Sequence, residues 1–225
     1  MSDDLTVYCV YWGTKYPKAY VYALKEMVEQ NLTAEHDFVC ITTDKFPGIQ
    51  TKLPFVSYSG WWQKIGLFAP TIAHGPSLYF DLDVVITGNI DYLVPYTEYQ
   101  FAAAENWAQS GHGGVQSSVM AWHGNWHEPY EKFDYQKDSK RLWGDQEFLW
   151  EMLENNWERI PGIGSYKYHC RNQGIPEWMN VMVFHGKPDP HEVGEKWLLP
   201  YTSTLRNHIN GSMGSGSKQG LSGTG

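Results

Sequence analysis

The chain has 225 residues, of which 42% are hydrophobic and 19% charged, the composition of a folded domain with a substantial core. Its formal net charge is −8 and it contains no basic run, so nucleic acid is not expected as a partner. Three cysteines without CxxC spacing indicate a reducing compartment, and neither a signal peptide nor a membrane-spanning segment is expected, so the sequence predicts a cytoplasmic protein.

The first sixty residues predict a βαβ unit. Residues 5–12 and 36–43 are continuous apolar runs of the kind found in buried parallel strands. Between them, apolar residues recur at helical spacing over 17–31. Two strands joined by one helix are expected to be parallel, with a right-handed crossover. Residues 47–59 are expected to be a loop that contains a weak short strand at 54–58.

A strand-type run with two carboxylates follows. Residues 61–68, WWQKIGLF, predict a short helix, and residues 77–86, SLYFDLDVVI, predict a strand with Asp81 and Asp83 in its middle. Residues two apart on a strand point to the same side, so we expect both carboxylates to face one spot. Unpaired charges there would be costly, and a bound Mn²⁺ or Mg²⁺ would remove the cost. The alternative is a strand end where both side chains reach water.

The second half of the chain predicts shorter elements. A clear helix is expected over residues 145–155, where Gly144 and Asp145 supply its start. Residues 123–141 are expected to be loop with fragments of helix. Strands are expected at 101–104, 117–122 and 180–184, a Gly-rich loop at 111–114, and a turn with a short strand at 160–170.

The end of the chain differs in composition from the rest. Beyond Asn210 the sequence is dominated by Gly and Ser, which cannot build a core. We therefore expect a single domain over residues 1–210 and a flexible tail or linker over 211–225.

Three further residues could complete a site around the aspartates. His185 directly follows an apolar strand, at the strand end where open α/β sheets bind ligands. With Asp81 and Asp83 it would form a three-ligand set with open positions for phosphate oxygens. Lys64 and Lys187 could meet a diphosphate from two sides. The plainer interpretations are a surface histidine and solvent-exposed lysines.

Two other groups could contact a sugar. Asp145 and Gln146 begin the helix at 145–155, where they could either cap it or face a substrate. Aromatic rings in or near loops of the second half could be platforms for sugar rings or part of the core. These rings belong to Trp107, Trp122, Trp126 and Trp143.

Together these motifs resemble those of GT-A fold glycosyltransferases of family 8, the glycogenin and bacterial galactosyltransferase type. YFDLDVVI resembles the DxD motif that holds Mn²⁺ and the nucleotide-sugar diphosphate, and WWQKIGLF is similar to the lysine-bearing helix. GDQEFL resembles the DQ motif, and VFHGKPDP a shortened form of the late HxxGxxKP segment. The family's Asn-Ser-Gly stretch is only loosely matched, by Gln116-Ser117-Ser118.

The resemblance assigns roles to single residues. It implies that Asp81, Asp83 and His185 bind the metal and that Lys64 and Lys187 contact the donor. Asp145 would lie near the donor sugar and Gln146 at its reactive face. The nucleoside would be bordered by the ends of the first two strands, which carry Tyr8, Tyr11, Trp12 and Asp44.

The implied fold is α/β of the GT-A type, a Rossmann-like nucleotide-binding half with a mixed, mostly parallel central sheet flanked by helices. The implied activity is transfer of a sugar from a nucleotide-diphosphate sugar to a hydroxyl of a glycan or protein, with Mn²⁺ or Mg²⁺ as cofactor. Family 8 implies retention of configuration, which needs no strong base. An inverting course would need a carboxylate to deprotonate the acceptor, and Glu105 or Asp145 are the candidates.

Two other functions remain open from the sequence. FDLDVV also satisfies the DxDx[TV] pattern of haloacid-dehalogenase-type phosphatases, in which Asp81 would be the nucleophile. That motif usually lies on the first strand of its domain, whereas here two predicted strands precede it. A non-catalytic sugar-binding protein would also account for the many aromatic residues.

Overall fold

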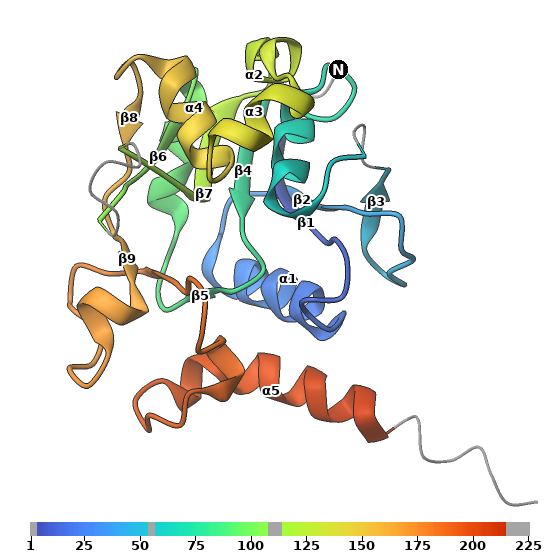
Figure 1. The fold of residues 1–225 in the computed structure, drawn as a ribbon. Coiled ribbons are helices and arrows are strands. Elements are labelled where there is room, and N and C mark those ends of the chain that lie inside the picture. The colour runs from blue at the N-terminus through green and yellow to red at the C-terminus, as the bar shows by residue number, and fades with distance from the viewer. Residues whose placement is uncertain (1–3, 54–56, 108–113, 215–225) are drawn as a thin grey trace, which may run out of the picture.

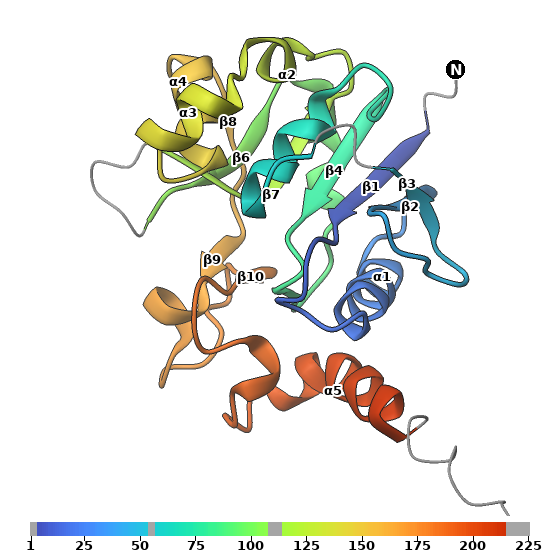
Figure 2. The ribbon, with the colours of Figure 1, turned by 45° about the vertical axis from the view of Figure 1, so that its right-hand side comes forward.

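The computed structural model describes residues 4–53, 57–107 and 114–214, with side chains described up to Asn210. A large sheet has the strand order β3-β2-β1-β4-β7-β6-β8, and a small sheet has the order β5-β10-β9. Helices α1 and α5 lie on one side of the large sheet and α2, α3 and α4 on the other (Figures 1 and 2). The strands of the large sheet are β1 (Leu5–Val10), β2 (His36–Ile41), β3 (Gln50–Lys52), β4 (Pro76–Phe80), β6 (Ala102–Glu105), β7 (Val115–His123) and β8 (Glu158–Arg159). The small sheet consists of β5 (Val84–Ile86), β9 (Ile163–Ser165) and β10 (Val181–Val183).

The βαβ unit at the start of the chain is confirmed. Strand β1 pairs in parallel with β2, from Leu5 opposite His36 to Val10 opposite Ile41. Between them, α1 (Ala19–Asn31) buries the apolar face that includes Tyr20, Leu24 and Val28. This face packs against the sheet because its residues recur at helical spacing.

The large sheet is mixed and mostly parallel, as the sequence predicts. The pairs β2–β3, β1–β2, β1–β4 and β6–β8 are parallel, whereas β4–β7 and β6–β7 are antiparallel. Alternate residues of its strands point into two hydrophobic cores, one on each face of the sheet. Val7 and Cys9 pack toward α1 and the small sheet, and Tyr8 packs toward the helices on the opposite face. Both sides of the sheet are therefore covered, as parallel strands require.

The prediction of one strand over residues 77–86 is wrong. Strand β4 ends at Phe80, and β5 begins at Val84 in the small sheet, where it pairs antiparallel with β10. Asp81 and Asp83 lie in the turn between them, closed by a hydrogen bond from the Val84 N–H to the Asp81 carbonyl at 3.2 Å. Because the flanking residues are apolar and buried on both sides of this turn, the local pattern could not separate two strands from one.

The later helices agree with the sequence. The predicted helical fragments are α2 (Glu128–Lys132) and α3 (Tyr135–Arg141), and the predicted helix at 145–155 is α4 (Asp145–Leu153). None of the helices among the described residues has the length and apolar character needed to cross a membrane.

Some elements were not expected. Strand β3 lies inside a predicted loop, and α5 (Leu199–Gly214) has no counterpart in the prediction. Helix α5 packs against α1, where Thr204 and His208 both reach the Glu26 carboxylate. The first four residues of the expected tail continue this helix, and the remainder of the tail lies outside the described residues. The predicted strand at 54–58 and loop at 111–114 also lie largely outside them, and Ser57 and Tyr58 are not in a strand.

The loop after α1 is joined to the start of the 3-10 helix at Asp91–Glu98 by a half-buried carboxylate. Asp91 accepts hydrogen bonds from the Thr33 N–H at 2.6 Å, from the Thr33 hydroxyl at 2.8 Å and from the Asn89 amide at 2.8 Å. The bonds from Asn89 and Thr33 lower the pKa of Asp91 from its ordinary value of 3.8 to about 2.

We therefore expect Asp91→Asn to lower the urea midpoint at pH 7. A carboxylate with a depressed pKa in the folded state stabilises the fold above its unfolded pKa, and this contribution disappears as the pH falls through the folded value. The difference between wild type and variant should accordingly shrink below pH 4 and be lost as the pH falls through about 2, the folded pKa given above. A difference that does not change with pH would contradict this role.

Candidate functional site

Two adjoining cavities open where the parallel strands of the large sheet end. The larger has a volume of about 720 Å³ and the smaller about 400 Å³, and both are lined by Val10, Trp12 and Gln63. Ligands of open α/β sheets bind at this edge, outside the carboxyl ends of the strands. The larger cavity receives side chains from the turn after β4, from β7, from the 3-10 helix η1 (Gly60–Phe68), from the start of α4 and from the segment after β10.

A buried lysine joins three of these elements. The Lys64 ammonium lies 3.2 Å from an Asp81 oxygen, 3.2 Å from an Asp145 oxygen and 3.0 Å from the Ser117 hydroxyl. Only 8% of the Lys64 side chain is exposed. Burial alone would lower the pKa of Lys64, but the charges of Asp145 and Asp81 outweigh it and hold the pKa above its ordinary range. Lys64 is therefore a fixed cation in the wall of the cavity.

The two aspartates predicted to act together do line the same cavity. Asp81 accepts a hydrogen bond from the Tyr79 hydroxyl at 2.6 Å, and Asp83 accepts one from the Tyr16 hydroxyl at 2.7 Å. Burial and the neighbouring charge of Asp81 raise the pKa of Asp83 to about 7. A buried carboxylate whose ionisation is opposed by its neighbour is the setting in which a cation stabilises the charged form.

His185 lines the same cavity as the aspartates. Its Nε2 lies 2.7 Å from the Ser165 hydroxyl, and its ring stacks on Tyr168 with centroids 5.6 Å apart. Burial and the nearby charge of Lys167 lower the pKa of His185, so the imidazole is neutral at pH 7, the form that ligates metals.

The side chains that line this cavity therefore suit a divalent cation, since two carboxylates and a neutral imidazole are common metal ligands. Across residues 4–53, 57–107 and 114–214, however, no three His, Cys, Asp or Glu side chains are arranged around a single point. Asp81, Asp83 and His185 thus share the lining of one cavity.

The start of α4 contributes the remaining predicted residues of the larger cavity. Asp145 and Gln146 both line it, and 5% of the Asp145 side chain is exposed. Tyr11, Trp12 and Asp44 line the smaller cavity, where Asp44 forms an ion pair with Lys18 at 2.9 Å.

Three predicted site residues do not belong to the described lining of either cavity. Tyr8 is 1% exposed and its hydroxyl donates to the Ile72 carbonyl, because the alternation of β1 directs it into the core. Glu105 has a 66% exposed side chain near Arg159. Lys187 is 71% exposed and its ammonium contacts Asp189 at 2.7 Å and Glu192 at 2.9 Å. All three thus lie outside the described lining of the two cavities.

Several residues that hold the predicted ones in place were given no role from the sequence, although Ser117 lies in a loosely matched motif. Tyr16 and Tyr79 hold the two aspartates, and Ser117 holds Lys64. Lys15 also lines the larger cavity, and its charge opposes the raised pKa of Asp83. Tyr79 could have been found from its place two residues before Asp81 in the predicted strand, but no local pattern marks Tyr16.

Two adjoining cavities thus open at the carboxyl edge of a mixed α/β sheet, and the turn that carries Asp81 and Asp83 lies in the wall of the larger. The structure is similar to the galactosyltransferase LgtC, solved in complex with donor and acceptor sugar analogs. The TM-score is 0.64 at 13% identity, covering 90% of this chain and 95% of LgtC.

Other glycosyltransferases share the fold. The glycosyltransferase GlyE of Streptococcus pneumoniae TIGR4 gives a TM-score of 0.68 at 14% identity, covering 98% of this chain and 66% of GlyE. The bifunctional glycosyltransferase WbbM gives 0.61 at 9% identity, covering 91% of this chain and 50% of WbbM. No protein family and no curated protein matches the sequence. The GT-A fold that the motifs imply is therefore confirmed, and at these identities the likeness concerns the fold alone.

Proposed function

We propose that this protein is a metal-dependent glycosyltransferase that moves a sugar from a nucleotide-diphosphate sugar to an acceptor hydroxyl. The observation that carries the proposal is the buried Lys64 between Asp81 and Asp145, in the wall of a cavity on a fold shared with glycosyltransferases. A fixed cation in a partly buried site is suited to the charge of a leaving diphosphate.

Each of the two cavities would bind a different part of the nucleotide-sugar donor. The smaller cavity, with Tyr11, Trp12 and Asp44, would take the nucleoside, and the larger would take the diphosphate and the sugar. Asp81, Asp83 and His185 would hold Mn²⁺ or Mg²⁺. When bound, the metal would neutralise negative charge on the diphosphate. The positive charges of Lys15 and Lys64, which also line the larger cavity, would stabilise the negative charge of the diphosphate as well.

In the reaction the bond between the anomeric carbon and the diphosphate oxygen breaks, and a bond from the acceptor oxygen to that carbon forms. Each described carboxylate in the larger cavity already has a partner: Asp81 and Asp145 pair with Lys64, Asp83 with Tyr16, and Glu147 with the Trp143 N–H. This supports a retaining course, in which the leaving diphosphate oxygen receives the acceptor proton. Gln146 would flank the anomeric carbon.

Two observations weigh against a phosphatase that uses Asp81 as nucleophile. Asp81 is held by Lys64 and Tyr79, and the fold likeness is to glycosyltransferases. A phosphatase would form a covalent phosphoryl-aspartate, which mass spectrometry of the protein after reaction with a small phosphate ester would detect.

The proposal is tested by thermal unfolding with UDP, GDP, ADP and TDP, each with and without Mn²⁺, followed by assays of donor hydrolysis. A ligand present at 100 times its Kd stabilises the fold by about 2.7 kcal/mol. We expect one nucleoside diphosphate to raise the melting temperature only when Mn²⁺ is present, and the corresponding nucleotide sugar to be hydrolysed slowly. If no nucleotide binds with or without Mn²⁺, the proposal fails.

Tyr16 offers a test of how the metal ligands are held. Tyr16→Phe removes the hydroxyl that donates to Asp83 at 2.7 Å. Loss of such a supporting contact typically weakens metal affinity by about 10- to 100-fold, and we expect the low end of that range for Mn²⁺. The matched control is Tyr22→Phe on α1, whose hydroxyl instead donates to the Pro47 carbonyl. Equal Mn²⁺ titrations of the two variants would contradict the role of Tyr16.

A further inference from the structure

Two exposed indoles line the larger cavity on either side of one glycine. The side chains of Trp61 and Trp143 line it and are 57% and 68% exposed. Both adjoin Gly144: Trp143 precedes it in the chain, and a Cβ atom on Gly144 would lie 3.2 Å from the Trp61 Nε1. Large exposed apolar rings at a cavity mark a surface that binds something, because water is a poor partner for them.

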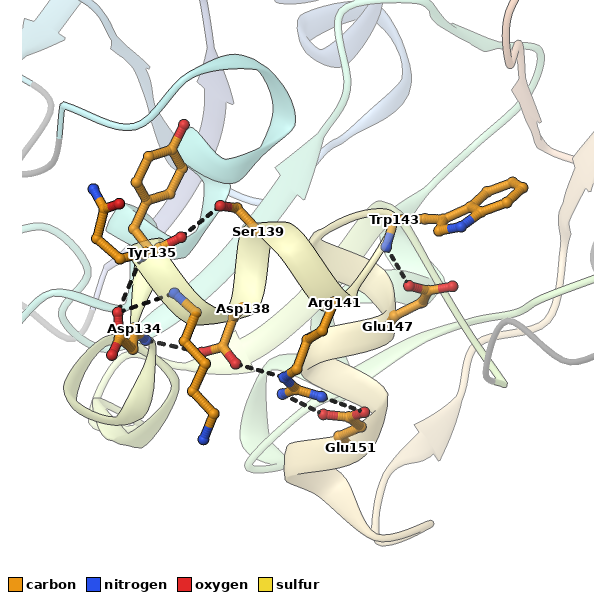
Figure 3. A network of polar contacts seen from close by, with 10 residues as sticks. Asp134, Tyr135, Asp138, Ser139, Arg141, Trp143, Glu147 and Glu151 are labelled. Atoms are coloured by element: carbon orange, nitrogen blue, oxygen red, sulfur yellow. Dashed lines mark hydrogen bonds and ion pairs between the residues drawn. The ribbon is translucent and has the colours of Figure 1, made fainter.

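The turn that carries Trp143 is fixed by a polar network (Figure 3). The Trp143 N–H donates to the Glu147 carboxylate at 2.5 Å, and Glu147 is 9% exposed. Arg141, the last residue of α3, contacts Asp138 of the same helix at 2.8 Å and Glu151 of α4 at 2.7 Å, so the second contact joins the two helices. The backbone on both sides of Trp143 is therefore held while its ring stays exposed, and such preorganisation favours ligand binding.

The other tryptophans considered as platforms for sugar rings lie in or against the core, or in the proposed nucleoside site. Trp122 and Trp126 are 0% and 6% exposed and belong to the core, and Trp107 packs against it. Trp12 lines both cavities and falls within the proposed nucleoside site.

We propose that Trp61 and Trp143 form a stacking platform for a sugar ring of the acceptor, so that the acceptor is a glycan. The inference rests on the proposed glycosyltransferase function. The apolar C–H face of a pyranose ring packs on an indole as other apolar surfaces do, while its hydroxyl groups reach polar neighbours. Gln146 and Glu147, next to the platform at the start of α4, line the same cavity and supply such groups.

The position of the platform favours the acceptor over the donor sugar. The charged groups proposed to bind the donor are deep in the cavity, where Lys64 and Asp83 are each 6% exposed. The two indoles are more than half exposed. A ring stacked on them would lie at the solvent side of the cavity, where the rest of a glycan chain can extend outward.

The inference is tested by saturation-transfer-difference NMR with lactose, maltose, cellobiose and chitobiose, in the presence of Mn²⁺ and UDP. We expect at least one disaccharide to bind through its ring C–H protons. Trp61→Ala and Trp143→Ala should each weaken that binding about 10-fold, the size expected for an aromatic contact. Trp143→Phe, which keeps an aromatic face, should retain most of it. The matched control is Trp178→Ala, since Trp178 is 51% exposed and lies outside the described lining of the cavity.

Both substituted indoles are exposed, so melting temperatures near that of the wild type should show that the variants fold. The inference would be wrong if the wild type bound none of the disaccharides. It would also be wrong if Trp178→Ala weakened disaccharide binding as much as the substitutions of Trp61 and Trp143. If Trp61→Ala or Trp143→Ala weakened the binding of a nucleotide sugar but not that of the disaccharide, the two indoles would belong to the donor site. The inference would then be wrong. Intact donor hydrolysis beside absent disaccharide binding would refute the platform and leave the proposed function standing. Disaccharide binding that needs both indoles, in a protein that binds no nucleotide, would keep the platform and refute the transferase.

Discussion

Lys64→Met is expected to lower the free energy of unfolding by about 3–5 kcal/mol, the cost of removing one partner from a buried ion pair. The substitution would leave Asp145, with 5% of its side chain exposed, and Asp81 without the cation that lies 3.2 Å from each. Donor hydrolysis should also fall below detection, because the fixed positive charge proposed to face the leaving diphosphate is gone. Urea unfolding measures the first effect and a nucleotide-release assay the second.

A second lysine provides the matched control for this prediction. Lys187 also contacts two carboxylates, Asp189 and Glu192, but its side chain is 71% exposed. Exposed ion pairs contribute little to stability, so Lys187→Met should leave the urea midpoint and donor hydrolysis close to those of the wild type. Similar losses in both lysine variants would mean that burial does not distinguish the two sites. The role given to Lys64 would then be wrong.

Asp145→Asn together with Lys64→Met would show whether the two groups act as a unit. If the ion pair accounts for most of the loss, the double variant should be more stable than the sum of the single losses predicts. Strictly additive losses would indicate that Lys64 acts mainly through Asp81.

Asp83→Asn is expected to abolish the Mn²⁺-dependent stabilisation by nucleoside diphosphates. Asp83 is 6% exposed and, with Asp81, supplies the carboxylates proposed to hold the metal. Loss of a direct ligand should cost at least the 10- to 100-fold in metal affinity that is typical of supporting contacts. The metal-free variant should melt no lower than the wild type, because the substitution removes one of two neighbouring negative charges.

Calorimetric titration of the nucleoside diphosphate with and without Mn²⁺ measures this effect. Asp44→Asn is the control, since Asp44 lines the smaller cavity and pairs with Lys18. It should retain the dependence on Mn²⁺ even if it weakens nucleotide binding. Unchanged metal dependence in Asp83→Asn would remove the metal from this site.

Much of the fold could be predicted from local pattern. The apolar runs that became β1 and β2, and the helical spacing of α1, report directly which side chains are buried. The motifs around Asp81, Lys64, Asp145 and His185 were found because their residue types and order resemble a known set. The structure brings all of them to one cavity.

Other features depended on contacts between distant parts of the chain. Helix α5 was missed because its stability comes from packing against α1, almost 180 residues away, which no local pattern reports. Tyr16 meets Asp83 across 67 residues, and Ser117 meets Lys64 across 53. The two lysines show the same limit, because sequence position alone could not tell the buried Lys64 from the exposed Lys187.

By itself, then, the sequence determined the βαβ start and the chemical types that the site contains, since periodicity and residue type are local properties. The class of fold came from the resemblance of its ordered motifs to those of a known family. Only the tertiary structure decided that Asp81 and Asp83 lie in a turn between two sheets, that Lys64 rather than Lys187 lines the cavity, and that Trp61 and Trp143 adjoin the same glycine. These facts depend on which elements pack together, and the free energy of that packing is shared among residues far apart in the chain.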